Sequence, residues 1–140
     1  MREEAKRTGN MTASRKVFDD SEAAHPITED EFIKIENIKG KLLMIGAEDD
    51  CLWNAAKYVK RAERRLAEKP HDCHAQFITY KHGTHFVFPE SLLKKIFPVG
   101  AGLLLKIMFK AAKEFPKECK ETRIDIDKRA SEAIKEWINK

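Results

Sequence analysis

Two short polar segments contain the residue types from which an acid–base pair can be built. One is Glu48-Asp49-Asp50, and the other is Lys81-His82-Gly83-Thr84-His85. An aspartate that accepts a hydrogen bond from one imidazole nitrogen fixes the tautomer of the ring, and the other nitrogen can then take a proton from a nucleophile. Asp50 and His85 are the candidates for these two roles. The alternative is that both segments are ordinary loops, because acidic clusters and glycine-flanked histidines are common in turns.

Each of these segments follows a predicted strand. Residues 42–45 form a short apolar run before Gly46, and residues 75–80 are rich in β-branched and aromatic side chains. Between them, apolar residues recur every three or four positions over 52–66, while lysine and arginine occupy the other positions. A strand, a helix and a strand form a βαβ unit, whose parallel strands end at the same edge of the sheet. We therefore expect an α/β fold that brings the two polar segments together.

The rest of the chain is predicted to be largely helical. The apolar pattern and the prolines indicate helices over residues 14–24, 103–115 and 126–138. The last of these is expected to lie on the sheet, with Asp125 or Asp127 capping its start. Residues 1–14 are polar without a sustained period, so we expect a loose arm there. Residues 15–140 contain no repeat or linker, which predicts a single domain.

The same segments resemble the α/β-hydrolases of the dienelactone hydrolase type. The nearest branch is the C-terminal domain shared by acyl-CoA thioesterases and bile acid-CoA:amino acid N-acyltransferases. The resemblance is carried by residues 20–23, 33–40 and 42–45, by Glu48-Asp49-Asp50-Cys51-Leu52-Trp53, by Gly83-Thr84-His85-Phe86 and by the closing helix with Trp137. In that family a Gly-Glu-Asp-Asp-x-Leu-Trp segment carries the triad acid, and a Gly-His after the last strand supplies the base. The resemblance implies that Asp50 is the acid and His85 the base, with Asp49 as the rival acid.

The sequence departs from the family pattern at several positions. Thr84 stands where glycine usually precedes the histidine, Asn54 stands where proline commonly follows the tryptophan, and Gly46-Ala47 inverts the usual order. The largest departure is the absence of Gly-x-Ser-x-Gly, the elbow that carries the nucleophile and part of the oxyanion hole. In such enzymes the nucleophile precedes the acid and the histidine in the chain. The resemblance thus implies that residues 15–140 are the C-terminal half of an α/β-hydrolase domain, after the elbow.

The implied function is that of one part of a serine hydrolase or acyltransferase acting on acyl thioesters or esters, inactive by itself and without a cofactor. The edge of its sheet would be open, so we expect a homo-oligomer or a complementing N-terminal half. Two alternatives remain. One is a non-catalytic α/β-hydrolase-like binding or interaction module, and the other is a small flavodoxin-like domain with no family tie.

Other reactive residues give weaker indications. Five ligand-type side chains lie within fifteen positions, but their spacing fits no zinc-ligand pattern, so we predict no metal site: His71, Cys73, His74, His82 and His85. Cys51 has no base placed beside it by the sequence and is expected to be a bystander thiol. The apolar residues over 86–97 could line an acyl-chain pocket, although such patches are more often core.

Composition excludes several function classes. Lysine and arginine number 27 against 23 aspartates and glutamates, and the charges are mixed along the 140 residues, so a nucleic-acid-binding surface is not indicated. The longest apolar stretch, residues 98–109, contains Lys106 and is too short for a membrane span. Three cysteines without a metal or redox spacing, together with an acidic start that lacks an apolar run, predict the cytoplasm.

Overall fold

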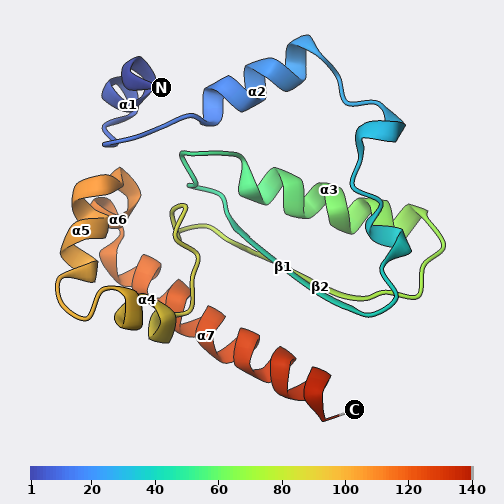
Figure 1. Cartoon of the computed structure of the whole chain (residues 1–140). Coiled ribbons are helices and arrows are strands. Elements are labelled where there is room, and N and C mark those ends of the chain that lie inside the picture. Colours follow the sequence, from blue (N-terminus) through green and yellow to red (C-terminus); the bar gives the residue numbers. More distant parts are fainter. Residues whose placement is uncertain (140) are drawn as a thin grey trace.

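The computed structural model describes residues 1–139 as helices arranged around two parallel strands (Figure 1). In chain order the elements are α1 (Arg2–Thr8), α2 (Arg15–Ala24), η1 (Glu29–Glu31), η2 (Ile35–Asn37), β1 (Lys41–Ala47), α3 (Ala55–Glu68), β2 (His74–Tyr80), α4 (Glu90–Ile96), α5 (Ala101–Met108), α6 (Lys110–Glu114) and α7 (Pro116–Ile138). None of the helices found in residues 1–139 has both the length and the apolar character needed to cross a membrane.

The predicted βαβ unit is confirmed. Strands β1 and β2 run parallel, and their register pairs Lys41 with His74 at one end and Ala47 with Tyr80 at the other. Within residues 1–139 the sheet has these two strands only, in the order β1-β2. The chain is therefore a mixed α/β structure in which both polar segments follow the carboxyl ends of the strands, at the same end of the sheet.

Helix α3 covers one face of the sheet because its apolar residues form a single stripe. Its buried positions include Ala55, Ala56, Val59, Ala62 and Leu66. Ala62 and Leu66 pack with Ile35 of η2 and with Cys73. The helix begins after Asn54, whose side-chain oxygen accepts a hydrogen bond from the backbone N–H of Lys57 at 3.3 Å.

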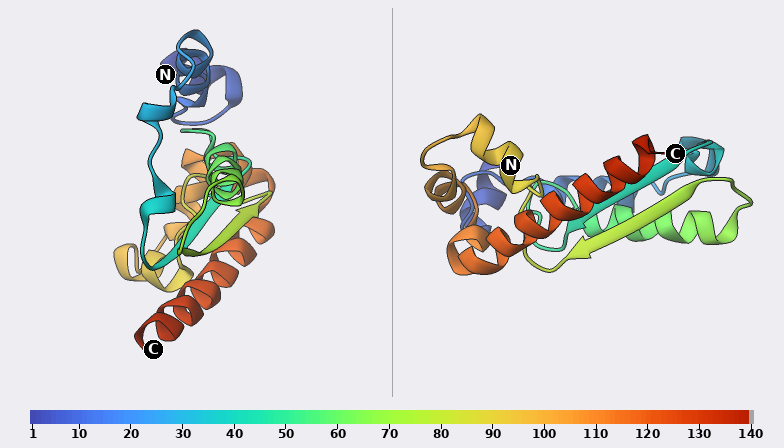
Figure 2. Two further views of the ribbon diagram at one scale, coloured as in Figure 1. Left: turned by 90° about the vertical axis from the view of Figure 1, so that its right-hand side faces the viewer. Right: turned by 90° about the horizontal axis from the view of Figure 1, so that it is seen from below.

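Helix α7 lies on the other side of the sheet from α3 (Figure 2). The Tyr80 hydroxyl donates to the carboxylate of Asp125 at 2.7 Å, and Lys41 pairs with Glu136 at 3.2 Å. The helix starts at Pro116, so the prediction that Asp125 or Asp127 caps it is wrong. Proline is favoured in the first helical turn, where its missing N–H costs nothing, and Pro116 both begins α7 and separates it from α6. Asp127 accepts from the backbone N–H and the hydroxyl of Ser91, at the start of α4.

The helix predicted over residues 103–115 is divided in the structure. Phe109 is extended, with φ −127° and ψ 124°, and separates α5 from α6. Its ring is 1% exposed and packs with Leu93, Leu105 and Ala112 in a second core. The extended residue allows two short helices to fold around one buried ring. Helix α4 lies in a segment for which the sequence predicted no helix.

The first fourteen residues contain a helix that the sequence pattern did not predict. Helix α1 ends at Gly9, whose φ of 72° is left-handed. The backbone N–H of Met11 then donates to Met108, and the side chain of Asn10 accepts from the N–H of Lys110, each at 2.9 Å. Ala13 is fully buried. A seven-residue helix is too short to show a period, and its contacts lie about a hundred residues away in the chain. The division at residue 15 stays a prediction.

Candidate active site

The two polar segments meet where the strands end. The backbone N–H of Glu48 donates to the carbonyl of Tyr80 at 2.8 Å, which continues the pairing of β1 and β2 by one step. Beyond this bond the chain turns into the loop that carries Asp49 and Asp50 on one side and the loop that carries His82 and His85 on the other. The parallel register thus brings the two aspartates and the two histidines to the same end of the sheet.

Asp50 and His85 are in hydrogen-bond contact. Oδ2 of Asp50 lies 3.0 Å from Nδ1 of His85, and the aspartate is 1% exposed. Oδ1 accepts from the backbone N–H groups of Leu52 at 2.8 Å and Trp53 at 3.3 Å. Because these amides hold the carboxylate in one orientation, the oxygen that faces the imidazole is fixed by the turn at the end of β1.

The ring of His85 is held from two sides. Trp53 meets it edge to face at a centroid distance of 5.1 Å, and Phe86 does so at 5.9 Å. The side chain is 25% exposed, and within residues 1–139 no group bonds its Nε2. A carboxylate at Nδ1 favours the neutral tautomer with its proton there, which leaves the Nε2 lone pair available as a base.

Asp49 contacts a different histidine. Its Oδ2 lies 3.2 Å from Nδ1 of His82, and its Oδ1 accepts from the backbone N–H groups of Gly83 at 3.0 Å and Thr84 at 2.8 Å. The ring of His82 stacks on Phe115 at a centroid distance of 3.9 Å. The two adjacent aspartates therefore diverge, and the one that meets His85 is Asp50.

Thr84 has a backbone conformation that β-branched residues rarely adopt. Its φ is 61°, and within residues 1–139 it is the one residue other than glycine with a positive φ. The side chain is 2% exposed, and its hydroxyl accepts from the N–H of Phe86 at 3.1 Å. The departure from glycine noted in the sequence thus falls where a left-handed residue stands directly before His85.

A model of the family described as "BAAT / Acyl-CoA thioester hydrolase C terminal" matches residues 3–92. The chain belongs to the BAAT / acyl-CoA thioester hydrolase C-terminal family. The matched region contains both aspartates and both histidines of the site, and it ends inside α4. Neither the search of curated proteins nor that of solved structures gave a significant match.

In this family member the segment of Asp50 is also fixed by residues from the start of α2. The backbone N–H groups of Ser14 and Arg15 both donate to the carbonyl of Cys51 at 3.0 Å, and the Ser14 hydroxyl donates to the carbonyl of Leu52 at 2.7 Å. The Arg15 side chain donates to the carbonyl of Glu48 at 2.7 Å. Sequence reasoning missed these supports, because nothing local to residues 14 and 15 indicates a partner more than thirty positions away.

Cys51 is poorly suited to act as the nucleophile. Burial, together with the charge of Asp50, raises the pKa of its thiol to about 11. Its Sγ lies 3.4 Å from the carbonyl oxygen of Thr12. The thiolate is the reactive form of cysteine, so this residue is largely unreactive near neutral pH.

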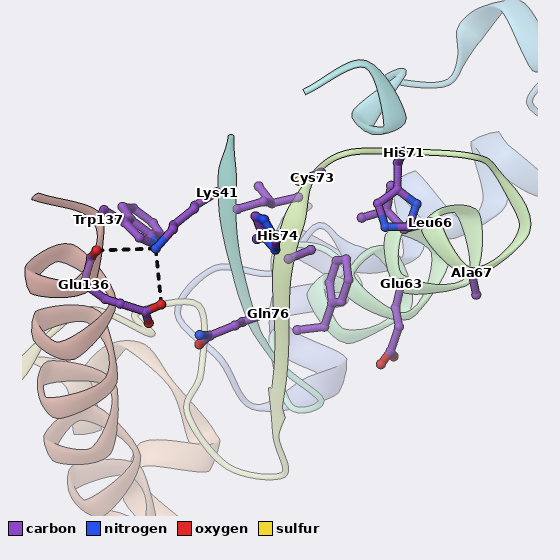
Figure 3. Close-up of a pocket in the computed structure, with 13 residues that line it drawn as sticks. Lys41, Glu63, Leu66, Ala67, His71, Cys73, His74, Gln76, Glu136 and Trp137 are labelled. Carbon is purple, nitrogen blue, oxygen red and sulfur yellow. Dashed lines mark hydrogen bonds and ion pairs between the residues drawn. The ribbon is translucent and has the colours of Figure 1, made fainter. Parts of the chain in front are cut away.

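The histidines and the cysteine considered as metal ligands lie at two opposite ends of the sheet. His71, Cys73 and His74 line a cavity of about 510 Å³ at the start of β2, between α3 and the end of α7 (Figure 3). His82 and His85 follow the other end of the same seven-residue strand, roughly 20 Å away. Among residues 1–139 there is no group of three or more side chains placed to hold a metal ion.

The apolar segment after His85 is divided between core and surface, since Leu93 is buried whereas Phe88, Leu92, Ile96 and Phe97 are exposed. Phe86 contacts Phe109 at a centroid distance of 5.5 Å and Phe88 at 5.2 Å, and Leu93 is buried in the same cluster. Phe88 and Leu92 are exposed on its outer side. One wall beside His85 is therefore aromatic and belongs to the packing between the β2 loop and α4–α6.

Proposed function

We propose that Asp50 and His85 are the acid and the general base of an α/β-hydrolase-type site that transfers acyl groups from thioesters or esters. In this proposal the nucleophile, a serine, comes from outside these 140 residues. The observation that carries the proposal is the contact between the buried Asp50 carboxylate and Nδ1 of His85, with Nε2 left open. Membership of the family supports acyl thioesters as the substrate class.

The chemistry follows from this geometry. Nε2 of His85 takes the proton of the serine hydroxyl as the oxygen attacks the thioester carbonyl, and the carbonyl electrons move to the oxygen. When the tetrahedral intermediate collapses, the C–S bond breaks and His85 returns the proton to the leaving thiolate. Water, or an amine in an acyltransferase, then attacks the acyl-enzyme with His85 again as base. Asp50 stabilises the imidazolium in both steps.

Completion of the site requires a second contribution. The sequence has no Gly-x-Ser-x-Gly, and the thiol of Cys51 is largely protonated at neutral pH. A two-stranded sheet is also smaller than the three or more strands that usually make a sheet independently stable. We therefore propose that a complementing N-terminal half, or a second copy of the chain, covers the edge of the sheet, and that the nucleophile and the oxyanion hole come with it.

An activated ester tests the acid–base pair in the 140-residue chain without the missing serine. Nε2 of His85 attacks p-nitrophenyl acetate, p-nitrophenolate leaves, and water hydrolyses the acetyl-imidazole. We expect slow turnover that His85→Gln abolishes and that Asp50→Asn slows roughly tenfold or more, because asparagine favours the wrong tautomer. His82→Gln is the matched control, since His82 has its own aspartate but stacks on Phe115. Equal losses in His82→Gln and His85→Gln would contradict the proposal.

A serine-reactive fluorophosphonate probe tests the origin of the nucleophile. We expect no labelling of the isolated chain, and labelling of a different polypeptide or segment when the chain is isolated with its native partner. A labelled serine within residues 1–140 would show that the nucleophile had been placed wrongly.

A second candidate function is a non-catalytic interaction module. It is favoured by the exposed apolar side chains around α5, where Val99, Leu103 and Ile107 are each more than half exposed. This alternative predicts no ester cleavage that depends on His85, so the same assay distinguishes the two functions.

A further inference from the structure

Asp49 links the loop after β1 to the loop that carries His85. We propose that Asp49 is a positioning residue, which fixes the backbone of residues 83–84 so that the ring of His85 faces Asp50. The inference rests on the function proposed above for Asp50 and His85, and it assigns a separate role to the neighbouring carboxylate.

Both hydrogen bonds from Asp49 to this backbone end at the two residues directly before His85. One oxygen, Oδ1, accepts from Gly83 at 3.0 Å and from Thr84 at 2.8 Å. Two successive N–H groups that converge on one carboxylate oxygen form an anion-binding turn, and a left-handed residue in such a turn is what makes them converge. The φ of 61° at Thr84 is therefore explained by the bond to Asp49.

The loop has little room for another conformation. A Cβ added at Gly83 would lie 2.9 Å from Cγ1 of Val87 and 3.1 Å from Cβ of Ala47. The Cγ2 of Thr122 would lie 3.2 Å from the same Cβ, and the Thr122 hydroxyl donates to the carbonyl of His82 at 2.5 Å. A strained residue persists when its surroundings hold it in place, and here the surroundings include the carboxylate of Asp49.

The contacts separate the roles of the two aspartates. Both oxygens of Asp49 are engaged, one by the backbone and the other by His82. Asp50 alone of the two meets the ring of His85. One carboxylate therefore orients the imidazole directly, and the other orients the backbone from which that imidazole extends.

NMR of the ¹⁵N-labelled 140-residue chain tests this role through the Nδ1–H proton of His85. We expect a protected signal in the unaltered chain. In Asp49→Ala the signal should be lost, or its exchange with water should become about tenfold faster or more. In Asp49→Asn it should persist, because the amide oxygen can still accept from both N–H groups. Glu48→Gln is the matched control, since it removes an adjacent charge that pairs with Lys60 on the surface.

Either of two results would overturn the proposal. One is an unchanged His85 signal in Asp49→Ala, and the other is an equal loss in Asp49→Asn and Asp49→Ala, which would assign the effect to charge. If Asp49→Ala does not fold, hydrogen exchange in the unaltered chain decides the question. The amides of Gly83 and Thr84 should then exchange slowly although they lie outside regular structure, and fast exchange would refute the bonds to Asp49.

Ester cleavage measured on the same variants separates this inference from the proposed function. If Asp50→Asn leaves cleavage unchanged, the proposed function fails, while the NMR result for Asp49 still stands or falls by itself. If both proposals hold, Asp49→Ala should lower kcat with little effect on KM, because both carboxylate oxygens of Asp49 are engaged within the protein. A change confined to KM would count against a positioning role.

Discussion

Replacement of Gly46 by alanine should disturb the junction between β1 and α3. A Cβ at this position would lie 2.9 Å from the carbonyl carbon of Ala55 and 3.1 Å from its oxygen and from its Cβ. Two of these three atoms are backbone, so relief requires the first turn of α3 to move by roughly 0.5 Å or more. Overpacking of this kind costs about 1–3 kcal/mol. Alanine recovers about 0.5–1 kcal/mol by restricting the unfolded chain.

The midpoints of these two ranges leave a net loss of about 1 kcal/mol, and their extremes a loss of up to about 2.5 kcal/mol; a loss of about 1 kcal/mol corresponds to a fall in Tm of roughly 3–4 °C for a chain of this size. Thermal unfolding followed by circular dichroism at 222 nm measures it. Gly40→Ala is the control, because a Cβ there meets nothing within 4 Å. Ester cleavage should fall as well, since the displaced turn adjoins the loop of Asp50. Equal Tm values for Gly46→Ala and Gly40→Ala would refute the packing argument.

Three further predictions concern charge, thiol chemistry and the second core. The Arg65 guanidinium lowers the pKa of Glu36 to about 2. The pair therefore stabilises the fold above the unfolded pKa near 4.5, and this contribution is lost as the pH falls toward 2. In Arg65→Gln the urea midpoint of unfolding should accordingly fall less steeply between pH 6 and pH 3. Because the pKa of the Cys51 thiol is about 11 instead of 9.0, Cys51 should react with iodoacetamide at pH 8 roughly 100-fold more slowly than in the unfolded chain. A mass-spectrometric time course measures the two rates, and equal rates would contradict the burial of the thiol. Phe109→Ala should cost about 3–5 kcal/mol, measured by urea unfolding, and a loss below 1 kcal/mol would mean that α4–α6 do not share one core.

The elements that could be predicted are those with a long, regular pattern. The fourteen residues of α3 show a complete apolar stripe, and the two strands beside it are rich in apolar, β-branched and aromatic residues, although β1 continues past Gly46 to Ala47. Short elements could not be predicted in the same way. Helices α1 and α4 have seven residues each, which is two turns and too few for a period to emerge. The break at Phe109 has a tertiary cause, because the ring is buried between helices that are distant from one another until the chain folds.

In the candidate site, too, the sequence pattern predicted one part of the arrangement, and tertiary contacts determine the other part. Parallel strands guarantee that the segments after Ala47 and Tyr80 are neighbours, so the meeting of an aspartate with a histidine followed from the pattern. The choice of Asp50 over Asp49 came from the resemblance to the family and not from the strand pattern, because adjacent residues differ only in the direction of their side chains. That direction is set by the turn amides of Leu52 and Trp53, which bind Asp50, and by the amides before His85, which bind Asp49.

The part of the chain beyond the matched residues 3–92 contributes to the site through the loop of His85. Phe115 stacks on His82, and Thr122 of α7 bonds the carbonyl of the same residue. Asp49 bonds the two residues that follow His82, so the backbone before His85 is held by two parts of the chain. A substitution at Phe115 or Thr122 is therefore expected to change the position of the histidine while Asp50 and His85 themselves stay the same.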